Sequence, residues 1–501
     1  MYSMQDNPSL QTLSELSEKI DSYSSLVEQF REQFPVLDQA PIYFDNAATS
    51  LRPQVVLESF TRGFAYAGNV ERSLHTFELS ALIKSGNNYL KNYFDPREDS
   101  QLVYTANTTQ AINLLAQTLG EFWCAQKNAA NSQETYYILV GQSNHHANLL
   151  PWIKLCQQYS FLQLKYIPLK EDLTFDLDYL QNFCQEHANN LLLVSISSVD
   201  NSNGMVHPIG KIKQILDTFS PHAWLALDNA QGSTYNQIYL EKAGCTDYWP
   251  ADFLIGSLHK MFGLTGIGYL ITTQRINQLK GKEDKDINLL TKFFKLSNEF
   301  INSQEKSNEE FIHLNLPYKG NSLNHQLVGG GFVKSINLDK VDYQLKDTNP
   351  FLIAGTPNIN AQVTVKDTIK WLNNQPLREL YDYTHLLQQY FLEHLRQFND
   401  VLDLSNATDA PSQLEVASHS LRILPSFGHH ISLSIEDGQD IDLGQELAKH
   451  NISVRVGKHC AYPYHDFLGV DSTLRISLAP YNTREEVEYA VEVMFNFFMN
   501  L

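Results

Sequence analysis

A lysine that follows a predicted buried strand stands where this sequence can do covalent chemistry. Lys260 comes after Ser257 and His259 in the run 253-FLIGSLHKMFGLTGIGYL, whose apolar start predicts a strand and whose glycines permit close approach of the backbone. An amine at a strand end can condense with an aldehyde to form a Schiff base. An isolated lysine is more often exposed and without chemistry, so its interpretation depends on the neighbouring residues.

Polar residues near other predicted strand ends supply such neighbours. Asp228 ends an apolar run, and a carboxylate there suits a heterocyclic nitrogen that must stay protonated. Thr108 and Thr109 open a predicted helix, whose backbone N–H groups and dipole favour a phosphate. His145 follows a strand and can stack on an aromatic ring. Each feature alone is also explained by a structural cap or a core histidine, but together with Lys260 they are the groups that pyridoxal phosphate requires.

One cysteine has the surroundings of a nucleophile. Cys460 lies in the polar, turn-like segment 455-RVGKHCAYPY, where a thiol can be exposed and mobile. Lys458 and His459 precede it, and cationic neighbours lower the pKa of a thiol and raise the fraction of thiolate, which is the form that attacks sulfur. The alternative is a buried cysteine that acts as a small hydrophobe, which is the usual role of this residue.

The pattern of apolar residues predicts a sheet that can position these groups. From about Gln101 to Leu270, short β-rich runs alternate with helix-like stretches. Alternation of this kind predicts an α/β sheet of parallel strands joined by helical crossovers, with a ligand at the carboxyl ends of the strands. The predicted strands begin at residues 101, 136, 191, 223, 252 and 267.

The segments outside this sheet predict further parts of the chain. Residues 8 to 33 have apolar residues at helical spacing and predict one amphipathic helix. The polar stretch from 272 to 324 is predicted to be a helical surface insertion. After Thr356 come two helical patterns, two strands and a last helix, which predict a smaller α+β domain. The helical patterns span residues 361 to 374 and 376 to 398, the strands lie near 430 and 452, and the last helix begins at about 484.

These segments divide the chain into three parts. We expect an N-terminal helical extension at residues 1–40, a large cofactor-binding domain at 41–360 and a small C-terminal domain at 361–501, which carries the loop of Cys460.

Composition narrows the class of protein. A chain of 501 residues that is 43% hydrophobic can bury a large core, and a formal charge of -19 disfavours nucleic acid as a partner. There is no apolar run long enough for a membrane helix, and the start lacks the features of a signal peptide, so we expect a cytoplasmic protein without membrane contact. Five cysteines without a CxxC pair indicate neither a metal site nor a disulfide framework.

Nine motifs in order resemble the class V aminotransferase family, and within it the group II cysteine desulfurases and selenocysteine lyases. They are 43-YFDNAAT, 69-NVERSLHT, 108-TTQAIN, 145-HHANLLPW, 228-DNAQ, 257-SLHK, 355-GTPN, 455-RVGKHCA and 475-RISLAPYNT. The resemblance covers most of the chain from about Pro41 onward. It implies the pyridoxal-phosphate transferase fold type I, with a mainly parallel seven-stranded sheet in the large domain and a smaller α+β C-terminal domain.

The resemblance also assigns roles to matching residues. It implies that Lys260 forms the Schiff base, that Asp228 pairs with the pyridine nitrogen and that His145 stacks on the ring and takes part in catalysis. The remaining cofactor contacts that it implies are Asn201 and Gln231 at the phenolic oxygen, and Thr108, Thr109, Ser257, His259 and Thr356 at the phosphate. Thr356 would come from the second subunit of a homodimer with a shared active site.

For the substrate, the resemblance implies Arg475, Arg455 and Asn69 as binding residues and Cys460 as the nucleophile. A guanidinium suits a carboxylate because it offers parallel donors in a fixed fork, although for a lone arginine a surface ion pair is the more common explanation. The expected reaction converts L-cysteine to L-alanine with a persulfide on Cys460, or L-selenocysteine to alanine and selenide, and a sulfur-acceptor protein is a possible partner. The alternative is a class V aminotransferase or C–S lyase that acts on another amino acid, with Cys460 not catalytic.

Overall fold

The structure, a computed structural model, describes most of the chain. The described residues are 12–39, 41–66, 74–98, 100–129, 132–273, 333–337, 342–345, 354–401, 413–416, 419–435 and 438–499. The predicted insertion at 272–324 falls almost entirely outside these ranges, and Asn69 lies outside them too.

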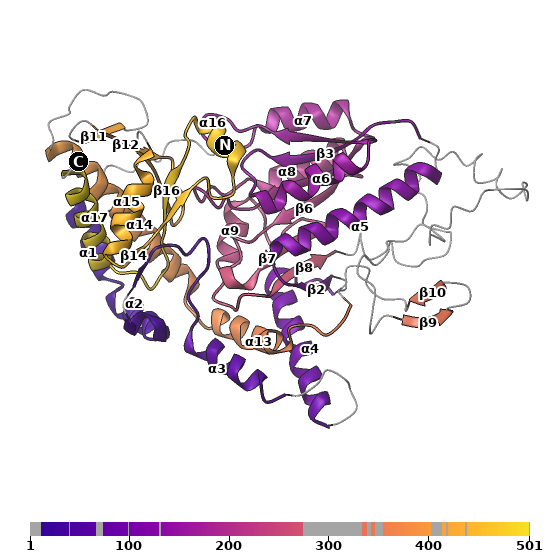
Figure 1. Ribbon diagram of the computed structural model, residues 1–501, viewed down its shortest axis with the longest axis horizontal. Helices are drawn as coiled ribbons and strands as arrows, with labels where there is room; N and C mark the ends of the chain where they lie inside the picture. Colours follow the sequence, from indigo (N-terminus) through magenta and orange to yellow (C-terminus); the bar gives the residue numbers. More distant parts are fainter. Residues whose placement is uncertain are drawn as a thin grey trace, which may run out of the picture.

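A seven-stranded sheet forms the centre of the larger lobe (Figure 1). In spatial order its strands are β2 (Gln101–Thr105), β8 (Gly268–Thr272), β7 (Phe253–Ser257), β6 (Trp224–Asp228), β5 (Leu191–Ser197), β3 (Tyr136–Gly141) and β4 (Leu162–Ile167). All neighbouring strands are parallel except β8, which runs antiparallel to both β2 and β7. This confirms the predicted α/β class and the six predicted strands.

Strand β4 was missed by the sequence analysis. It lies at the edge of the sheet, and its central residues are exposed or only partly buried. An edge strand carries polar residues among its apolar ones, so its sequence lacks the continuous apolar run of the inner strands.

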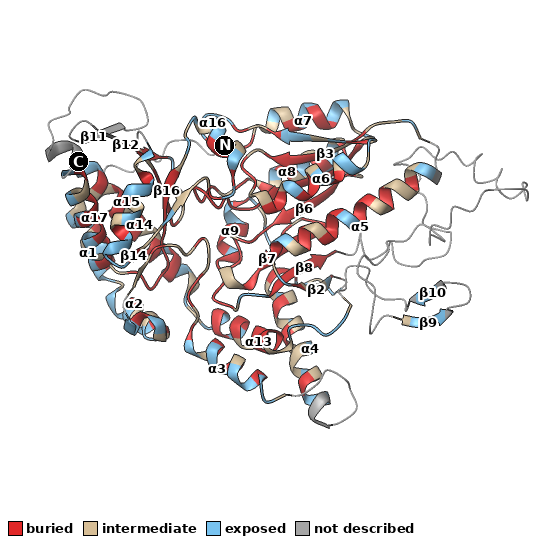
Figure 2. Ribbon diagram, viewed as in Figure 1, coloured by how far each residue is buried: buried red, intermediate tan, exposed pale blue. Residues whose placement is uncertain are grey.

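Helices cover both faces of this sheet, and alternate residues of each strand face opposite sides. Ile138 packs with residues of α5 (Thr108–Ala129) and α6 (Leu150–Gln158). Its neighbour Leu139 belongs to the core on the other face, which includes residues of α7 (Leu177–Glu186) and α8 (Ile209–Phe219). Figure 2 shows the strands as an almost continuous buried layer. The sheet is therefore a rigid platform with its strand ends free to carry a site.

The C-terminal region forms a second lobe around a five-stranded antiparallel sheet. Its strand order is β11 (Gln413–Val416), β12 (His419–Leu424), β13 (His430–Ile435), β16 (Thr473–Ser477) and β15 (Arg455–Gly457). The helices α14 (Leu377–Val401), α15 (Asp440–Lys449) and α17 (Arg484–Met499) pack against it. The predicted strand near 430, the predicted helix at 376 to 398 and the last helix are confirmed. The stretch near 452 holds two short strands, β14 (Ile452–Ser453) and β15, instead of one. The helix predicted at 361 to 374 is confirmed as α13 (Ile359–Asn373), which packs on helices outside this lobe.

Shorter elements connect these parts. The strand β1 (Ile42–Tyr43) pairs in parallel with β14 (Ile452–Ser453), and α13 (Ile359–Asn373) packs on α3 (Gln54–Gly63) and α4 (Leu74–Phe94). The other described elements are η1 (Pro35–Gln39), η2 (His146–Asn148), α9 (Asn236–Lys242), η3 (Leu258–Lys260), β9 (Val333–Asn337), β10 (Asp342–Leu345) and α16 (Tyr462–Leu468).

The single helix predicted at residues 8 to 33 is wrong, because two helices occupy the described part of this segment. They are α1 (Leu13–Asp21) and α2 (Ser24–Arg31). The break is explained by serine hydroxyls, since the Ser22 and Ser24 side chains donate hydrogen bonds to the carbonyls of Lys19 and Asp21 and compete with the helix backbone. Both helices still bury apolar residues against the C-terminal lobe.

Among the helices that the structure describes, none is both long and apolar enough to cross a membrane.

Candidate active site

A cavity of about 260 Å³ lies where strands β5, β6 and β7 end at their carboxyl sides. Ser197, Asp228 and Ser257, the last residues of these strands, all line it. The lining also includes residues in the segments that follow β1, β3, β5, β6 and β7, residues at the start of α5 and residues of the C-terminal lobe. These residues are Ala47, Ala48, Thr49, Asn107, Thr108, Thr109, His145, Ala147, Val199, Asn201, Ala230, Gln231, His259, Lys260, Arg455, His459, Cys460 and Arg475.

Lys260 ends the short helix η3, one turn beyond β7. Its carbonyl accepts a hydrogen bond from the Thr234 hydroxyl at 2.8 Å, which fixes the backbone of the lysine. Burial lowers the pKa of the Lys260 amine to about 8; the Asp228 carboxylate opposes this effect, and the charges of Arg475 and Arg455 add to it. The amine therefore has a larger neutral, nucleophilic fraction near neutral pH than an ordinary lysine has.

Asp228 is a buried carboxylate at the end of β6. Its Oδ1 accepts the backbone N–H of Ala230 at 3.0 Å. Burial raises the pKa of Asp228, while the Ala230 N–H and the charge of Lys260 oppose the rise. A carboxylate in such a place is stabilised by a cationic group nearby, so the site is suited to hold a protonated heterocycle.

His145 is the N-cap residue of η2, and its ring has a defined tautomer. Its Nδ1 accepts the backbone N–H of Ala147 at 3.0 Å, so the proton of the neutral ring is on Nε2. Burial lowers the pKa of His145 to about 3, and the charge of Lys260 adds to this. The ring is neutral at physiological pH, which suits it for contact with a flat aromatic group.

The start of α5 presents an anion site to the cavity. The Ser257 hydroxyl accepts the backbone N–H of Thr108 at 2.8 Å and lies 2.7 Å from the Thr108 hydroxyl. Thr109 follows on the same turn, and His259 also lines the cavity, with a pKa lowered by burial to about 4. A helix N-terminus with hydroxyls at this spacing favours a phosphate.

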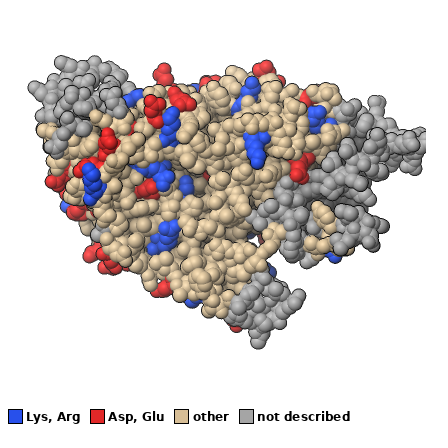
Figure 3. Space-filling view, in the orientation of Figure 1, with Lys and Arg blue, Asp and Glu red and all other residues tan. Residues whose placement is uncertain are grey.

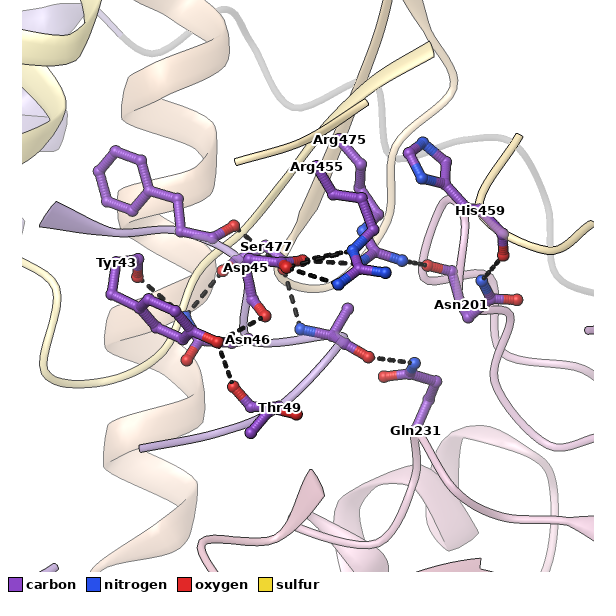
Figure 4. Close-up of polar contacts among 12 residues, drawn as sticks. Tyr43, Asp45, Asn46, Thr49, Asn201, Gln231, Arg455, His459, Arg475 and Ser477 are labelled. Atoms are coloured by element: carbon purple, nitrogen blue, oxygen red, sulfur yellow. Dashed lines mark hydrogen bonds and ion pairs between the residues drawn. The ribbon is translucent and has the colours of Figure 1, made fainter. Parts of the chain in front are cut away.

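Two arginines from the C-terminal lobe reach the cavity. Arg475 on β16 is almost fully buried, and its Nη1 donates to the carbonyl of Asn201 at 2.7 Å. Arg455 on β15 is about half exposed. Both guanidiniums contact Asp45, a residue to which the sequence analysis gave no role although it lies in the motif 43-YFDNAAT (Figure 4). A strand-following aspartate in that motif was the only signal from which it could have been found.

The two residues predicted to contact the phenolic oxygen of the cofactor, Asn201 and Gln231, form hydrogen bonds with backbone carbonyls of the protein. The Asn201 amide donates to the carbonyl of His459 at 2.8 Å, and the Gln231 amide donates to the carbonyl of Ala47 at 2.9 Å (Figure 4). These bonds hold both side chains at the edge of the cavity.

Cys460 is exposed and lines the cavity on a tightly turned loop. Its φ of 56° and the φ of 46° at His459 are both in the left-handed region, which is costly for residues with side chains. The loop is held there from outside, because the backbone N–H of His146 donates to the Cys460 carbonyl at 2.7 Å. The thiol is thus held at a set place in the wall of the cavity that Lys260 also lines.

The predicted role of His459 as a cation beside the thiol is wrong. Its ring is buried, and burial lowers the pKa of His459 to about 2, with the charge of Arg475 adding to the effect. His459 Nε2 lies 2.8 Å from the hydroxyl of Thr473, the first residue of β16. The Lys458 ammonium is 3.4 Å from the Asp466 carboxylate, so its charge is shared with an anion.

The structure brings together every predicted site residue except two. Thr356 is exposed and does not line the cavity of its own chain, and Asn69 lies outside the described residues.

The pKa of Lys260 predicts how fast the protein takes up an aldehyde. We expect the rate at which pyridoxal phosphate attaches to the cofactor-free protein to rise with pH and level off above about 8, because the neutral amine then predominates. For a lysine with an ordinary pKa, the attachment rate would continue to rise up to a pH of about 10.4. The adduct can be trapped with borohydride and assigned by peptide mass.

Two controls accompany this measurement. Lys260→Arg should give no label, and Nα-acetyl-lysine, treated in parallel, corrects for titration of the aldehyde itself. A rate that still climbs steeply above about pH 9 would contradict a lowered pKa at Lys260.

An α/β platform with a partly buried lysine, a buried aspartate and an anion-binding helix start at its strand ends defines an enzyme dependent on pyridoxal phosphate, of fold type I. The sequence profile of the class V aminotransferases matches residues 42–282 and 318–490. The chain belongs to the class V aminotransferase family, whose members use this cofactor.

Curated relatives and solved structures resemble this chain over most of its length. A Haemophilus influenzae protein named "Probable cysteine desulfurase" is 27% identical over 469 residues, covering 92% of this chain and 87% of the relative. A cysteine desulfurase of Cronobacter sakazakii is 25% identical over 476 residues, covering 93% and 96%. The structure is similar to that of a cysteine desulfurase from Thermococcus onnurineus, with a TM-score of 0.70, 24% identity and coverage of 95% and 98%. At that identity the structural likeness shows the fold.

Proposed function

We propose that this protein is a pyridoxal-phosphate-dependent cysteine desulfurase. It converts L-cysteine to L-alanine and keeps the sulfur as a persulfide on Cys460, or, with two electrons from a reducing thiol, converts L-selenocysteine to alanine and selenide. One observation carries the proposal: the exposed Cys460 thiol lines the same cavity as the Lys260 amine and two arginines. The names of the relatives support it.

The residues of the cavity fit the cofactor. Lys260 would attach it, the buried Asp228 would pair with its ring nitrogen, and the neutral His145 would face its ring. The phosphate would bind at the start of α5 through Thr108, Thr109, Ser257 and His259, and the phenolic oxygen would contact Asn201 and Gln231. When bound, pyridoxal phosphate draws electrons from an amino acid and weakens the bonds at its α- and β-carbons.

The protein's own groups account for the remaining chemistry. Arg475 and Arg455 orient the substrate carboxylate, and the neutral Lys260 amine takes and returns the α-proton. The Cys460 thiolate attacks the substrate sulfur, forming an S–S bond while the C–S bond breaks and leaves its electron pair on carbon. That carbon takes a proton, so cysteine and the enzyme thiol yield alanine and an enzyme persulfide in balance.

A homodimer with a shared site is part of the proposal. Thr356 is exposed and does not line the cavity of its own chain, although the motif 355-GTPN matches a phosphate-binding segment of the family. A second copy would bring this threonine to the phosphate. The persulfide must also pass its sulfur on, and we propose an acceptor protein with a free thiol.

The test of the function is a Cys460→Ala variant. With L-cysteine and a reducing thiol, we expect the variant to make alanine at least tenfold more slowly than the parent, because a thiol in solution only partly replaces one held in place. Alanine and sulfide are quantified, and the parent should yield them in equal amounts. Cys245→Ala is a matched control, since Cys245 lies outside the cavity and burial raises its pKa to about 11.

The result also separates the main alternative. Unimpaired turnover of Cys460→Ala on both cysteine and selenocysteine would indicate a class V aminotransferase or C–S lyase in which this cysteine is a bystander. If the parent protein forms alanine neither from cysteine nor from selenocysteine, its substrate is another amino acid.

A further inference from the structure

Asp45 lies between the two guanidiniums of the substrate pocket (Figure 4). Its Oδ1 is 2.9 Å from Nη2 of Arg475. Arg455 binds the same carboxylate with two donors, because its Nε is 3.2 Å and 3.1 Å from the two oxygens and its Nη2 is 3.0 Å from Oδ2. Two cationic side chains that the proposed function assigns to the substrate therefore already share one anion of the protein.

The backbone around Asp45 is anchored, so its carboxylate cannot move far from this place. Asp45 forms a parallel bridge with Ser477, the last residue of β16. Directly after Asp45, the Asn46 N–H donates to the Ser477 carbonyl at 3.3 Å and the Ala47 N–H donates to the Ser477 hydroxyl at 2.9 Å. The carboxylate is a built part of the pocket.

Few N–H donors of the two guanidiniums remain for a substrate. Arg475 uses Nη1 for the Asn201 carbonyl and Nη2 for Asp45, and its buried Nε has no hydrogen-bond partner among the described residues. The Nε and Nη2 edge of Arg455 is taken by Asp45. Two guanidiniums and one carboxylate leave a single positive charge, which one substrate carboxylate neutralises. The Asp45 charge also opposes the effect of both arginines on Lys260.

We propose that Asp45 is a specificity-determining residue of this pocket: it neutralises one of the two guanidiniums, so that the site selects amino acids with one carboxylate and rejects those with a second anion in the side chain. The inference rests on the proposed function in that it takes an amino acid as substrate. Specificity of this kind comes from a repulsive element as much as from an attractive one. In a partly buried site, a like charge a few ångströms away changes affinity by about tenfold or more.

The test compares two ligands of the same shape. L-aspartate and L-asparagine are titrated into the cofactor-loaded protein, and binding is followed by cofactor absorbance. The wild type should bind asparagine more tightly than aspartate, and in Asp45→Asn the ratio of the two dissociation constants should shift toward aspartate by at least about tenfold. Asp45→Glu keeps the charge and should restore the preference for asparagine.

Further variants separate charge from structure. Arg455→Gln removes a cation of the same cluster from a half-exposed position, and it should shift the ratio the opposite way, further against aspartate. Asp466→Asn is the matched control, because it removes a carboxylate that pairs with Lys458 outside the cavity, and its ratio should equal that of the wild type. The Arg455→Gln result also decides the case should Asp45→Asn fail to fold.

Equal binding of the two ligands by the wild type would overturn the proposal, as would an unchanged ratio in Asp45→Asn or in Arg455→Gln. The ratio is a binding measurement and needs no turnover. A protein that makes no alanine from cysteine but still shows the charge-dependent ratio would refute the proposed reaction and leave the role of Asp45 intact.

Discussion

A Lys260→Ala variant will make alanine from cysteine at least about 10³-fold more slowly than the wild type. Proton transfer by a positioned group contributes about 10²–10⁴ in rate, and this lysine also attaches the cofactor. Burial makes the amine available, since it lowers the pKa of Lys260 to about 8. No other lysine lines the cavity in the part of the chain that the structure describes, so none can take over. The measurement is alanine formed under single-turnover conditions.

Chemical rescue tells the missing amine apart from misfolding. Methylamine added to Lys260→Ala should restore part of the activity, whereas Lys260→Arg should not respond. Lys242→Ala is a matched control, because Lys242 is also partly buried but lies beside Tyr381, away from the cavity. More than about a tenth of wild-type activity in Lys260→Ala without added amine would contradict an essential role, since that loss is only about 1.4 kcal/mol in barrier.

An Asp228→Asn variant should lose about 10²–10³ in alanine formation, the range found when one preorganised electrostatic group is removed from a site. The carboxylate is buried at the end of β6, and burial raises its pKa. Asparagine keeps the size of the side chain and can still accept the Ala230 N–H, so the variant removes the charge alone. Without that charge the cofactor nitrogen loses the partner that keeps it protonated. Initial rates at saturating cysteine measure the loss.

The permanently charged analogue N-methyl pyridoxal phosphate gives a direct check. Because its ring nitrogen stays cationic without help, it should return most of the lost rate to Asp228→Asn. Asp440→Asn is the control, since Asp440 is another buried carboxylate, with its pKa raised to about 6, and it lies outside the cavity. A rate for Asp228→Asn within a few-fold of wild type would mean that the ring nitrogen needs no counter-charge.

Surface charge was a weaker guide than these buried groups. In Figure 3, acidic side chains gather on the left side of the face shown, over the C-terminal lobe, while basic side chains are scattered across the middle. The net charge of -19 reflects that exterior. The chemistry depends instead on a few cations inside the cavity, whose contacts no overall charge reveals.

Prediction from sequence succeeded for elements whose structure depends on the residues of one strand or one helix alone. Inner strands such as β5 consist of buried residues throughout, so their apolar runs are unmistakable, and the residues at their ends were placed with them. Prediction failed for elements whose structure depends on their exposure or on side-chain hydrogen bonds. The edge strand β4 is half exposed, and the break between α1 and α2 depends on serine side chains that a helical apolar pattern does not register.

The cysteine loop shows the same limit at the site. From sequence, His459 is a possible cation next to Cys460, and at pH 7 its charge would depend on its surroundings. Burial beside Arg475 lowers its pKa to about 2, so it contributes no charge to the thiol. Asp45 was likewise only part of a motif until β1 and β16 placed its carboxylate against Arg455 and Arg475.

The sequence by itself determined the α/β class, the strand ends that carry Lys260 and Asp228, and the candidate nucleophile Cys460, because each depends on local pattern and residue type. Only the tertiary structure decided which of these groups share a cavity, which imidazoles are neutral and which anion the arginines hold. Those properties depend on burial and on charges contributed by segments more than 400 residues apart, such as Asp45 and Arg475. Burial and distance are properties of the folded chain, and they set the pKa values and ion pairs on which the chemistry depends.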